Sequence, residues 1–340
     1  MKIRLGEVER LAQIPGKGFI EGPSYCPDDG YLYFVEIEAG WISRVSMEGR
    51  YEQFYNIGAP GGLMGPNGMI YDSKEKRLLI AHRAMGVVSL DPKTKKAEVI
   101  VVDYKGKKFN GPNDLTVDSK GNIFFSDPWG TSVSNPIGSV YRWDAQTGQL
   151  DLFMEHLAFP NGILLSPDEQ YIYVCEFGQN RILRAPLVDG GKSHVFLHAM
   201  TYFSGGWGPD SMGMDVLGNL YVGHFGYGKV FVVEPRVGEI IEVIDIPDPA
   251  GTGSDNARFG GPDNKTLFIT EGFQRVIYKE DAEKAVRYAR FSTIGVRGAD
   301  PTVRSARYKC GDFNWEEFIR ESNEEVMVIA LLEEVSEQSG

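Results

Sequence analysis

The 340-residue sequence has only three cysteines, Cys26, Cys175 and Cys310, and none of them belongs to a CxxC pair. An odd number of cysteines cannot form a closed set of disulfides, so the sequence predicts a chain from a reducing compartment, the cytoplasm. Cys26 and Cys175 lie in apolar, alternating stretches. We therefore expect them to be buried thiols rather than reactive ones.

Basic residues are also few, and long hydrophobic runs are absent. The sequence has 35 lysines and arginines against 47 aspartates and glutamates, a net charge of −12. This balance argues against nucleic acid and anionic membranes as partners, because both attract basic surfaces. No stretch of about 18 apolar residues indicates a transmembrane helix. The first residues, MKIRLGEVERLAQ, lack the apolar centre of a signal peptide.

Glycine, in contrast, is abundant, with 41 residues, about 12% of the chain against a usual share of about 7%. Its excess indicates many tight turns. One pattern recurs along the chain: a polar residue, an apolar stretch, a turn such as PDDG or SPDEQ, and a second apolar stretch. The copies begin at Glu21, Asn67, Asn113, Asn161, Asp210 and Asn256, with spacings of 46, 46, 48, 49 and 46 residues.

Each copy reads as four short strands. A third strand, such as Trp41–Val45, follows a glycine-containing link, and a fourth, such as Tyr51–Tyr55, often comes next. Four strands in about 46 residues are typical of a propeller blade. The sequence therefore predicts an all-β fold, a six-bladed β-propeller over residues 1–292. To close the ring, we favour the strand-like Glu7–Ile14 over Ala285–Phe291 as the strand that completes blade six.

Residues 293–340 fall outside the repeat and are predicted to form a short helical C-terminal extension. No glycine or proline occurs from Phe313 to Ser339, and Ser322 with Glu325 fits a capping box. The extension is acidic. It is interpreted either as a helical or partly disordered appendage, or as a lid or a contact within a homo-oligomer.

The leading residues of the six copies are expected to form a polar ring. The first strand of each blade lines the channel of a propeller, so these residues should encircle one of its mouths. The ends of the second strands return to the same face, as a rim of Glu36, His82, Asp127, Glu176, His224 and Glu271. Carboxylate and amide oxygens in the inner ring favour a hard cation such as Ca²⁺ over a zinc site of thiolates or several histidines. Alternatively, the asparagines only cap strands and satisfy turns.

Four motifs resemble a known family. They are Glu21-Gly-Pro, Gly111-Pro-Asn-Asp, Pro160-Asn-Gly followed by SPDEQYIYV, and Gly208-Pro-Asp-Ser-Met-Gly. Together they resemble the senescence marker protein/gluconolactonase/luciferin-regenerating-enzyme family over about residues 15–275. This family is similar to squid diisopropyl fluorophosphatase and, more distantly, to paraoxonases.

The resemblance implies a six-bladed propeller with a divalent cation, often Ca²⁺, in its channel. Members hydrolyse lactones, and some cleave phosphoester-type bonds. Carried over by motif, Glu21, Asn161 and Asp210 would be metal ligands, and Asn113 would be a ligand or touch the substrate. One departure concerns the arginine that sugar lactonases often place just before the Asn113 motif, where this chain has Phe109-Asn-Gly-Pro. Its absence argues against an aldonolactone substrate. The acidic tail is a second departure.

These observations predict a metal-dependent hydrolase that opens a lactone. The cation, most simply Ca²⁺ with Zn²⁺ or Mn²⁺ as alternatives, would polarise the carbonyl, and Asp210 or the cation would activate water. Asn113 and a rim histidine, His82 or His224, would orient the substrate.

Aromatic loops on the same face predict a small-molecule pocket and a lactone or ester with a sizeable apolar part. The expected substrate contacts are Asn67, Asp127, Trp129, Glu176, Trp207, Phe225 and Tyr227. The alternatives are a phosphotriesterase-like hydrolase at the same metal, a non-catalytic ligand-binding propeller, and a strictosidine-synthase-like protein.

Overall fold

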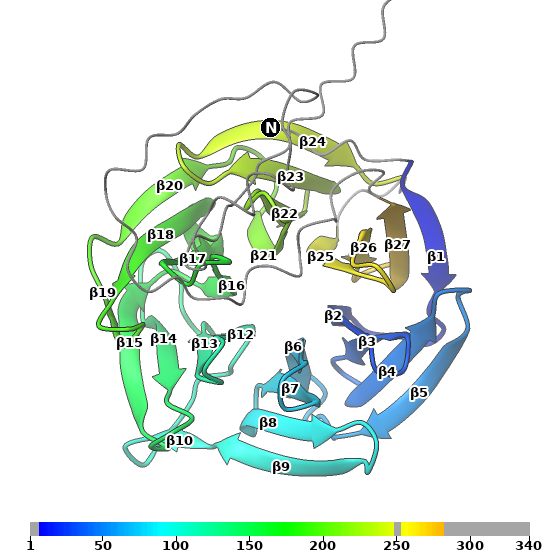
Figure 1. Ribbon diagram of the computed structural model, residues 1–340, viewed down its shortest axis with the longest axis horizontal. Helices are drawn as coiled ribbons and strands as arrows, with labels where there is room; N and C mark the ends of the chain where they lie inside the picture. Colours follow the sequence, from blue (N-terminus) through cyan, green and yellow to red (C-terminus); the bar gives the residue numbers. More distant parts are fainter. Residues whose placement is uncertain (1–6, 248–252, 282–340) are drawn as a thin grey trace, which may run out of the picture. The chain divides into compact units, whose positions relative to one another are not determined.

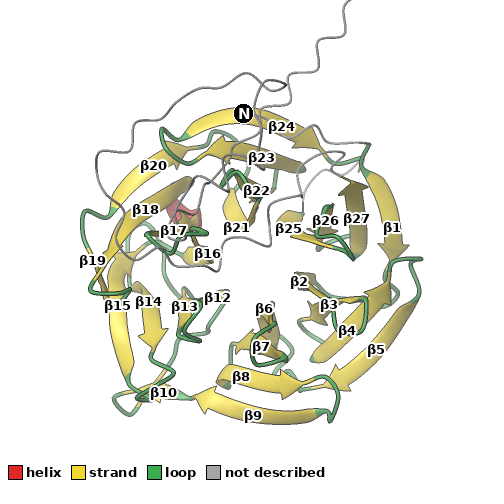
Figure 2. Ribbon diagram, viewed as in Figure 1, coloured by secondary structure: helices red, strands yellow, loops and turns green. Residues whose placement is uncertain are grey.

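The computed structural model describes residues 7–247 and 253–281. They form six sheets of four or five strands arranged in a ring about a common axis (Figure 1), and one further two-stranded sheet, which confirms the six-bladed propeller. Within these ranges the only helical element is the 3₁₀ turn η1 (Phe177–Gln179), and strands make up the blades (Figure 2). The helical extension, the boundary at residue 292, Cys310 and Ala285–Phe291 all lie outside the described residues. No helix in the described ranges has the length and apolar character that crossing a membrane would require.

The first three blades each run outward from the axis in chain order. Blade one contains β2 (Ile20–Cys26), β3 (Tyr31–Glu36), β4 (Trp41–Ser46) and β5 (Tyr51–Asn56). Blade two contains β6 (Pro66–Asp72), β7 (Arg77–His82), β8 (Gly86–Asp91) and β9 (Lys96–Val101). A small hairpin of β10 (Asp103–Tyr104) and β11 (Lys107–Lys108) leads to blade three, with β12 (Leu115–Val117), β13 (Ile123–Asp127), β14 (Gly138–Trp143) and β15 (Leu150–Leu157).

Blades four and five repeat this order. Blade four contains β16 (Pro160–Leu165), β17 (Tyr171–Glu176), β18 (Arg181–Val188) and β20 (His198–Tyr202), with the short β19 (Ser193–His194) also paired to β18. Blade five contains β21 (Gly208–Met214), β22 (Leu220–Phe225), β23 (Lys229–Glu234) and β24 (Glu239–Asp245).

Blade six joins the two ends of the propeller. Its inner strands are β25 (Ser254–Gly260), β26 (Thr266–Glu271) and β27 (Val276–Asp281), and its outer strand is β1 (Glu9–Gln13), which pairs antiparallel with β27. The expected closure by the N-terminal strand is confirmed.

A single buried arginine reinforces this closure. Arg275, just before β27, donates to the carbonyl oxygens of Ile14, Pro15, Lys17 and Gly18 at distances of 3.3, 2.7, 3.0 and 2.9 Å. It also forms an ion pair of 2.5 Å with Glu36 at the end of β3. One guanidinium thus connects blade six, the N-terminal segment and blade one.

The core lies between the blades. In the described residues, six clusters of buried apolar side chains are each shared by two adjacent blades. For example, Val35 of blade one packs in the same cluster as Ile80 of blade two. Each sheet buries both faces, which explains why the inner strands read as continuous apolar runs. Cys26 and Cys175 are buried free thiols, as expected.

An acidic pair between blades five and six predicts a pH-dependent stability. Burial, and then the nearby Glu242 carboxylate, raises the pKa of Glu280 to about 7. The folded state therefore holds a proton that the unfolded chain releases above its ordinary pKa of about 4.5. Between about pH 4.5 and 7, this group makes the free energy of unfolding fall as the pH rises.

We expect Glu280→Gln to raise the free energy of unfolding at pH 8 by about 1–2 kcal/mol and to change it little at pH 4.5. Urea denaturation at the two pH values measures this difference. Glu239→Gln, at an exposed residue at the start of β24, is the matched control. Equal effects of Glu280→Gln at both pH values would contradict the prediction.

Candidate active site

The polar ring lies where the sequence placed it on most blades. In blades one, two, four and five, the ring residue comes directly after the inner-strand residue that pairs with the rim residue of the same blade. These ring residues are Glu21, Asn67, Asn161 and Asp210. Asn113 lies two residues before β12, and its N–H donates to the Ser126 carbonyl. The repeat therefore brings these side chains to equivalent positions at one end of the channel.

In blade six the ring position is Asp255 and not Asn256, which the repeat indicated. Ser254 pairs with Glu271 and Asn256 with Thr270, so Asp255 directly follows the residue paired with the end of the second strand. The inner strands of blades one, two, four and five have a register shift at the same place. Asp255 is fully buried, and burial, followed by the charges of Glu21 and Asp210, raises its pKa well above the usual range. The ring thus includes a third carboxylate, which the repeat phase of the sequence missed.

Glycine follows several ring residues because neighbouring inner strands approach closely. The Gly68 N–H donates to the Asn113 carbonyl at 2.5 Å, and a Cβ on Gly68 would lie 2.6 Å from that oxygen. A Cβ on Gly162 would lie 2.7 Å from the Asp210 carbonyl. The Asn-Gly pairs of the repeat therefore allow the polar side chains to converge.

Hydrogen bonds orient the ring side chains. The Asn67 amide donates to Glu21 Oε2 at 2.9 Å and to Asn113 Oδ1 at 3.1 Å, and the Asn161 amide donates to Asp210 Oδ1 at 2.5 Å. All five residues are buried. The Oδ1 atoms of Asn67 and Asn161 are buried without a hydrogen-bond partner in the described part of the chain.

Burial disfavours the charged forms of the Glu21 and Asp210 carboxylates, which converge at the ring. Burial, and then the charge of Asp210, raises the pKa of Glu21 well above its usual range. Burial likewise raises the pKa of Asp210 to about 7, although the Asn161 hydrogen bond and the Arg83 charge oppose the shift. Buried carboxylates of this kind are stabilised as anions by a nearby cation.

The donor set fits a hard divalent cation. Glu21 and Asp210 supply buried carboxylate oxygens, and Asn161 supplies an amide oxygen that has no other partner in residues 7–247 and 253–281. Within residues 7–247 and 253–281, no group of three or more histidine, cysteine, aspartate or glutamate side chains could hold a metal ion. A cation here would therefore depend on amide oxygens as well as carboxylates, which suits Ca²⁺ better than Zn²⁺.

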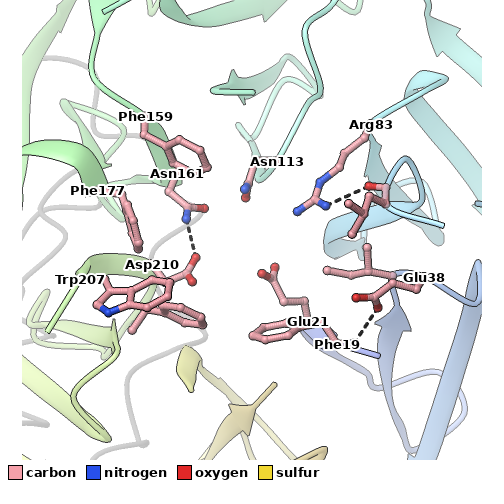
Figure 3. Close-up of a pocket in the computed structure, with 13 residues that line it drawn as sticks. Phe19, Glu21, Glu38, Arg83, Asn113, Phe159, Asn161, Phe177, Trp207 and Asp210 are labelled. Carbon is pink, nitrogen blue, oxygen red and sulfur yellow. Dashed lines mark hydrogen bonds between the residues drawn. The ribbon is translucent and has the colours of Figure 1, made fainter. Parts of the chain in front are cut away.

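A pocket of about 310 Å³ opens over this ring. It is lined by Phe19, Glu21, Ile37, Glu38, Leu63, Arg83, Asn113, Phe159, Asn161, Phe177, Trp207, Asp210 and Phe225. Figure 3 shows Phe159, Phe177 and Trp207 on one side of the pocket, and Arg83 on the opposite side. The floor is polar, and the wall from blades four and five is aromatic.

A family model described as the SMP-30/Gluconolactonase/LRE-like region matches residues 19–272 of this chain. These residues contain the whole lining of the pocket. The chain belongs to this family. It is 32% identical over 236 residues to a gluconolactonase of Zymomonas mobilis, an alignment covering 64% of this chain and 62% of that protein. It is 37% identical over 134 residues to the lactonase drp35 of Staphylococcus epidermidis, covering 38% of this chain and 41% of that one.

A solved structure of this propeller type gives the same fold. A calcium-binding protein, regucalcin, from Agrobacterium tumefaciens superposes with a TM-score of 0.65 at 19% identity, covering 82% of this chain and 95% of that one. The present chain spans about three fifths of the Zymomonas relative and two fifths of the Staphylococcus relative.

In this SMP-30/gluconolactonase-like chain, the rim histidines do not line the pocket. His82 Nε2 lies 3.0 Å from the Gly58 carbonyl, and its Nδ1 accepts the N–H groups of Ala84 and Met85. His224 Nε2 lies 2.8 Å from Asn180 Oδ1. Burial lowers the pKa of His82, and it lowers the pKa of His224 to about 4. Both imidazoles are therefore neutral groups that hold neighbouring loops.

The rim carboxylates also hold loops. Asp127 accepts the N–H groups of Asn110 and Gly111 at 2.9 and 2.6 Å. Glu176 accepts the Ala158 N–H at 2.8 Å and pairs with Arg181 at 2.6 Å. Neither lines the pocket. Asn67, Trp129 and Tyr227 are likewise not among its lining residues, whereas Trp207 and Phe225 are.

The pocket instead uses the residues that directly follow the rim. Ile37, Arg83, Phe177 and Phe225 come immediately after Glu36, His82, Glu176 and His224. Ile37 and Arg83 lie just beyond the ends of β3 and β7, and Phe177 begins η1, so these three side chains line the pocket from the segments that follow the strands. The position directly after the expected end of a second strand was the signal that could have identified Arg83. No arginine precedes Asn113, but Arg83 reaches the pocket from blade two.

Proposed function

We propose that this chain is a metal-dependent hydrolase that opens a lactone bearing an apolar or aromatic part. The observation that carries the proposal is the convergence of Glu21, Asn113, Asn161 and Asp210 on the floor of a pocket with an aromatic wall. The family relatives named gluconolactonase and lactonase support lactone hydrolysis. The calcium-binding regucalcin supports a divalent cation.

Glu21, Asn161 and Asp210, with Asn113, would hold the cation, for which Ca²⁺ is the best match. When bound, a divalent cation supplies Lewis-acid polarisation of the lactone carbonyl. The amides of Asn67 and Asn161 orient the carboxylates of Glu21 and Asp210, and Asn113 would orient the substrate beside them.

Asp210 is proposed as the general base. One of its oxygens accepts the Asn161 amide, and the other is left to take a proton from the attacking water. The water oxygen forms a bond to the carbonyl carbon, the ring C–O bond breaks, and the proton passes to the departing alkoxide. The product is a hydroxy acid, and Asp210 returns to its anionic form.

The aromatic wall supports an apolar substrate. Phe159, Phe177, Trp207 and Phe225 present rings to the cavity, and Trp207 is 66% exposed. Aromatic surface of this extent contributes binding free energy to an alkyl or aryl substituent but little to a bare polyol.

A lactone panel tests this function and its metal dependence. We expect aromatic or alkyl lactones to be hydrolysed in preference to gluconolactone. EDTA should lower the rate at least about tenfold, and added Ca²⁺ should restore it, because buried carboxylates alone cannot supply Lewis-acid polarisation. A pH-indicator assay measures the acid released, with Mn²⁺ and Zn²⁺ added in parallel.

Three results would contradict parts of the proposal. Gluconolactone far ahead of the other lactones would rule out the apolar substrate. Full activity after EDTA would rule out the metal. An organophosphate turned over faster than every lactone would instead indicate a phosphotriesterase.

A further inference from the structure

Arg83 is the single cationic side chain among the residues that line the pocket. It follows His82 at the end of β7, and its guanidinium reaches the cavity across from the aromatic wall (Figure 3). The proposed hydrolysis assigns no step to Arg83, because it needs only the ring residues and the cation.

The Arg83 guanidinium has N–H donors that the described residues do not use. Nη1 donates to the Leu63 carbonyl at 2.9 Å, and Nε is buried with no hydrogen-bond partner among the described residues. No carboxylate of the described residues lies within ion-pair distance of Arg83. Since a guanidinium carries five N–H donors, most of its hydrogen-bonding capacity remains for a ligand.

The orientation of Arg83 is built into blade three. Its Cζ lies 4.5 Å from the centre of the Trp129 ring, so the guanidinium stacks on the indole and keeps its edge for hydrogen bonds. A Cβ on Gly111 would lie 2.9 Å from Trp129 Cβ, so glycine at this position leaves room for the Trp129 side chain. Asp127 holds Gly111 through its N–H at 2.6 Å. Trp129 and Asp127 therefore act as positioning residues for Arg83.

The charge of the pocket admits an anion once a cation is present. The lining contains three carboxylates, Glu21, Glu38 and Asp210, and one guanidinium. A divalent cation and Arg83 together offset the three negative charges of the lining, whereas Asp255 lies outside the lining and accepts the Thr270 hydroxyl. Glu38 Oε2 is already engaged, because it accepts the Phe19 N–H at 2.6 Å.

We propose that Arg83 binds a carboxylate of the substrate, on the side of the pocket opposite the aromatic wall. The planar fork of a guanidinium matches a carboxylate with two parallel hydrogen bonds. The preferred ligand then has an apolar part facing Phe159 and Phe177, a carboxylate facing Arg83, and the lactone ring between them. The lactone ring rests on the proposed function, whereas the carboxylate subsite stands on the contacts of Arg83.

Binding without turnover tests the subsite directly. The probe is 3-phenylpropanoate compared with its neutral amide, titrated by calorimetry into the Ca²⁺-loaded protein. We expect the acid to bind at least tenfold more tightly than the amide. Arg83→Gln should remove that difference, Arg83→Lys should keep part of it, and Arg50→Gln should keep all of it. Arg50 is a suitable control because its side chain is 79% exposed on the β4–β5 turn.

An acid preference that survives Arg83→Gln would overturn the proposal, because the carboxylate would then bind elsewhere, such as at the cation. If Arg83→Gln does not fold, Trp129→Leu provides the second test. It leaves the guanidinium in the chain but removes its stacking partner, and it should lower the acid-over-amide ratio three- to tenfold. An unchanged ratio would contradict the positioning role of Trp129.

Kinetics add a readout specific to the lactone. For a butyrolactone carrying a carboxylate, Arg83→Gln should lower kcat/KM about 30- to 100-fold, mainly through KM. For the matching carboxamide, the change should be less than threefold. Equal losses for both lactones would assign Arg83 to the reacting carbonyl and refute the subsite. Absence of lactone hydrolysis by the unaltered protein would refute the proposed function, and the acid-over-amide comparison would still decide the role of Arg83.

Discussion

Asp210→Asn is expected to lower kcat/KM for lactone hydrolysis about a thousandfold while leaving the propeller folded. The carboxamide has nearly the same shape and still offers an oxygen to the Asn161 amide, which donates to Asp210 at 2.5 Å. It cannot, however, accept a proton from water or contribute a negative charge to a cation site. Function and stability should therefore separate at this residue.

The stability effect has a definite sign. Because burial raises the pKa of Asp210 to about 7, the ionised carboxylate destabilises the metal-free fold above that pH. Asp210→Asn should therefore keep or increase the free energy of unfolding at pH 8 in EDTA, and it should reduce the stabilisation that added Ca²⁺ produces.

Steady-state kinetics and urea denaturation, each with and without Ca²⁺, measure the two effects. Asp263→Asn, which removes a carboxylate that is 59% exposed, is the control for charge alone. Near-normal turnover by Asp210→Asn would transfer the role of base to another group. A loss of activity that accompanies unfolding in EDTA would show that Asp210 is structural.

Arg275→Met is expected to cost about 3–5 kcal/mol of the free energy of unfolding. The substitution leaves the Glu36 carboxylate, whose side chain is 4% exposed, without its ion-pair partner. It also removes the donor from four carbonyl oxygens of the N-terminal segment, those of Ile14, Pro15, Lys17 and Gly18. The junction between blades six and one should therefore open first.

A double substitution separates these contributions. Arg275→Met combined with Glu36→Gln should recover part of the loss, because a buried amide costs less than a buried unpaired charge. Urea denaturation gives the free energies, with Arg50→Met as an exposed control that should change them by less than about 0.5 kcal/mol. A loss below about 1 kcal/mol for Arg275→Met would show that strand pairing alone closes the ring.

The blades could be predicted from the sequence because the signals are local and repeated. Turn residues such as PDDG delimit apolar strands, and the third strand expected at Trp41–Val45 is found at Trp41–Ser46. Six similar units reinforce one another, and ring closure follows from counting strands. The polar ring followed from the same phase, except on blade six, where the ring position is Asp255 and the repeat indicated Asn256, one residue later.

The wall of the pocket was harder to predict. The ends of the second strands were expected to face the ligand, but His82 and Glu176 face loops, and Arg83 and Phe177 face the cavity. Arg83 and Phe177 lie one residue beyond the ends of β7 and β17, where the pairing of the strands no longer sets the direction of a side chain. Strand ends are therefore where a repeat alone predicts the position of a residue better than its direction. Arg83 also depends on Trp129 of another blade, a contact that spacing does not reveal.

The pairing of β1 with β27 has a consequence for biosynthesis. Gln13 hydrogen-bonds to the carbonyl of Gln274, 261 residues later in the chain. At roughly 5–20 residues per second on a ribosome, β1 waits about 15–50 s for its partner. During that time β1, and the unpaired edge of every incomplete blade, can pair with other unpaired strands. A nascent chain stalled before Val276 would carry five complete blades, the β25–β26 pair of blade six and an unpaired β1, and should be a preferred client for chaperones that recognise unpaired strands.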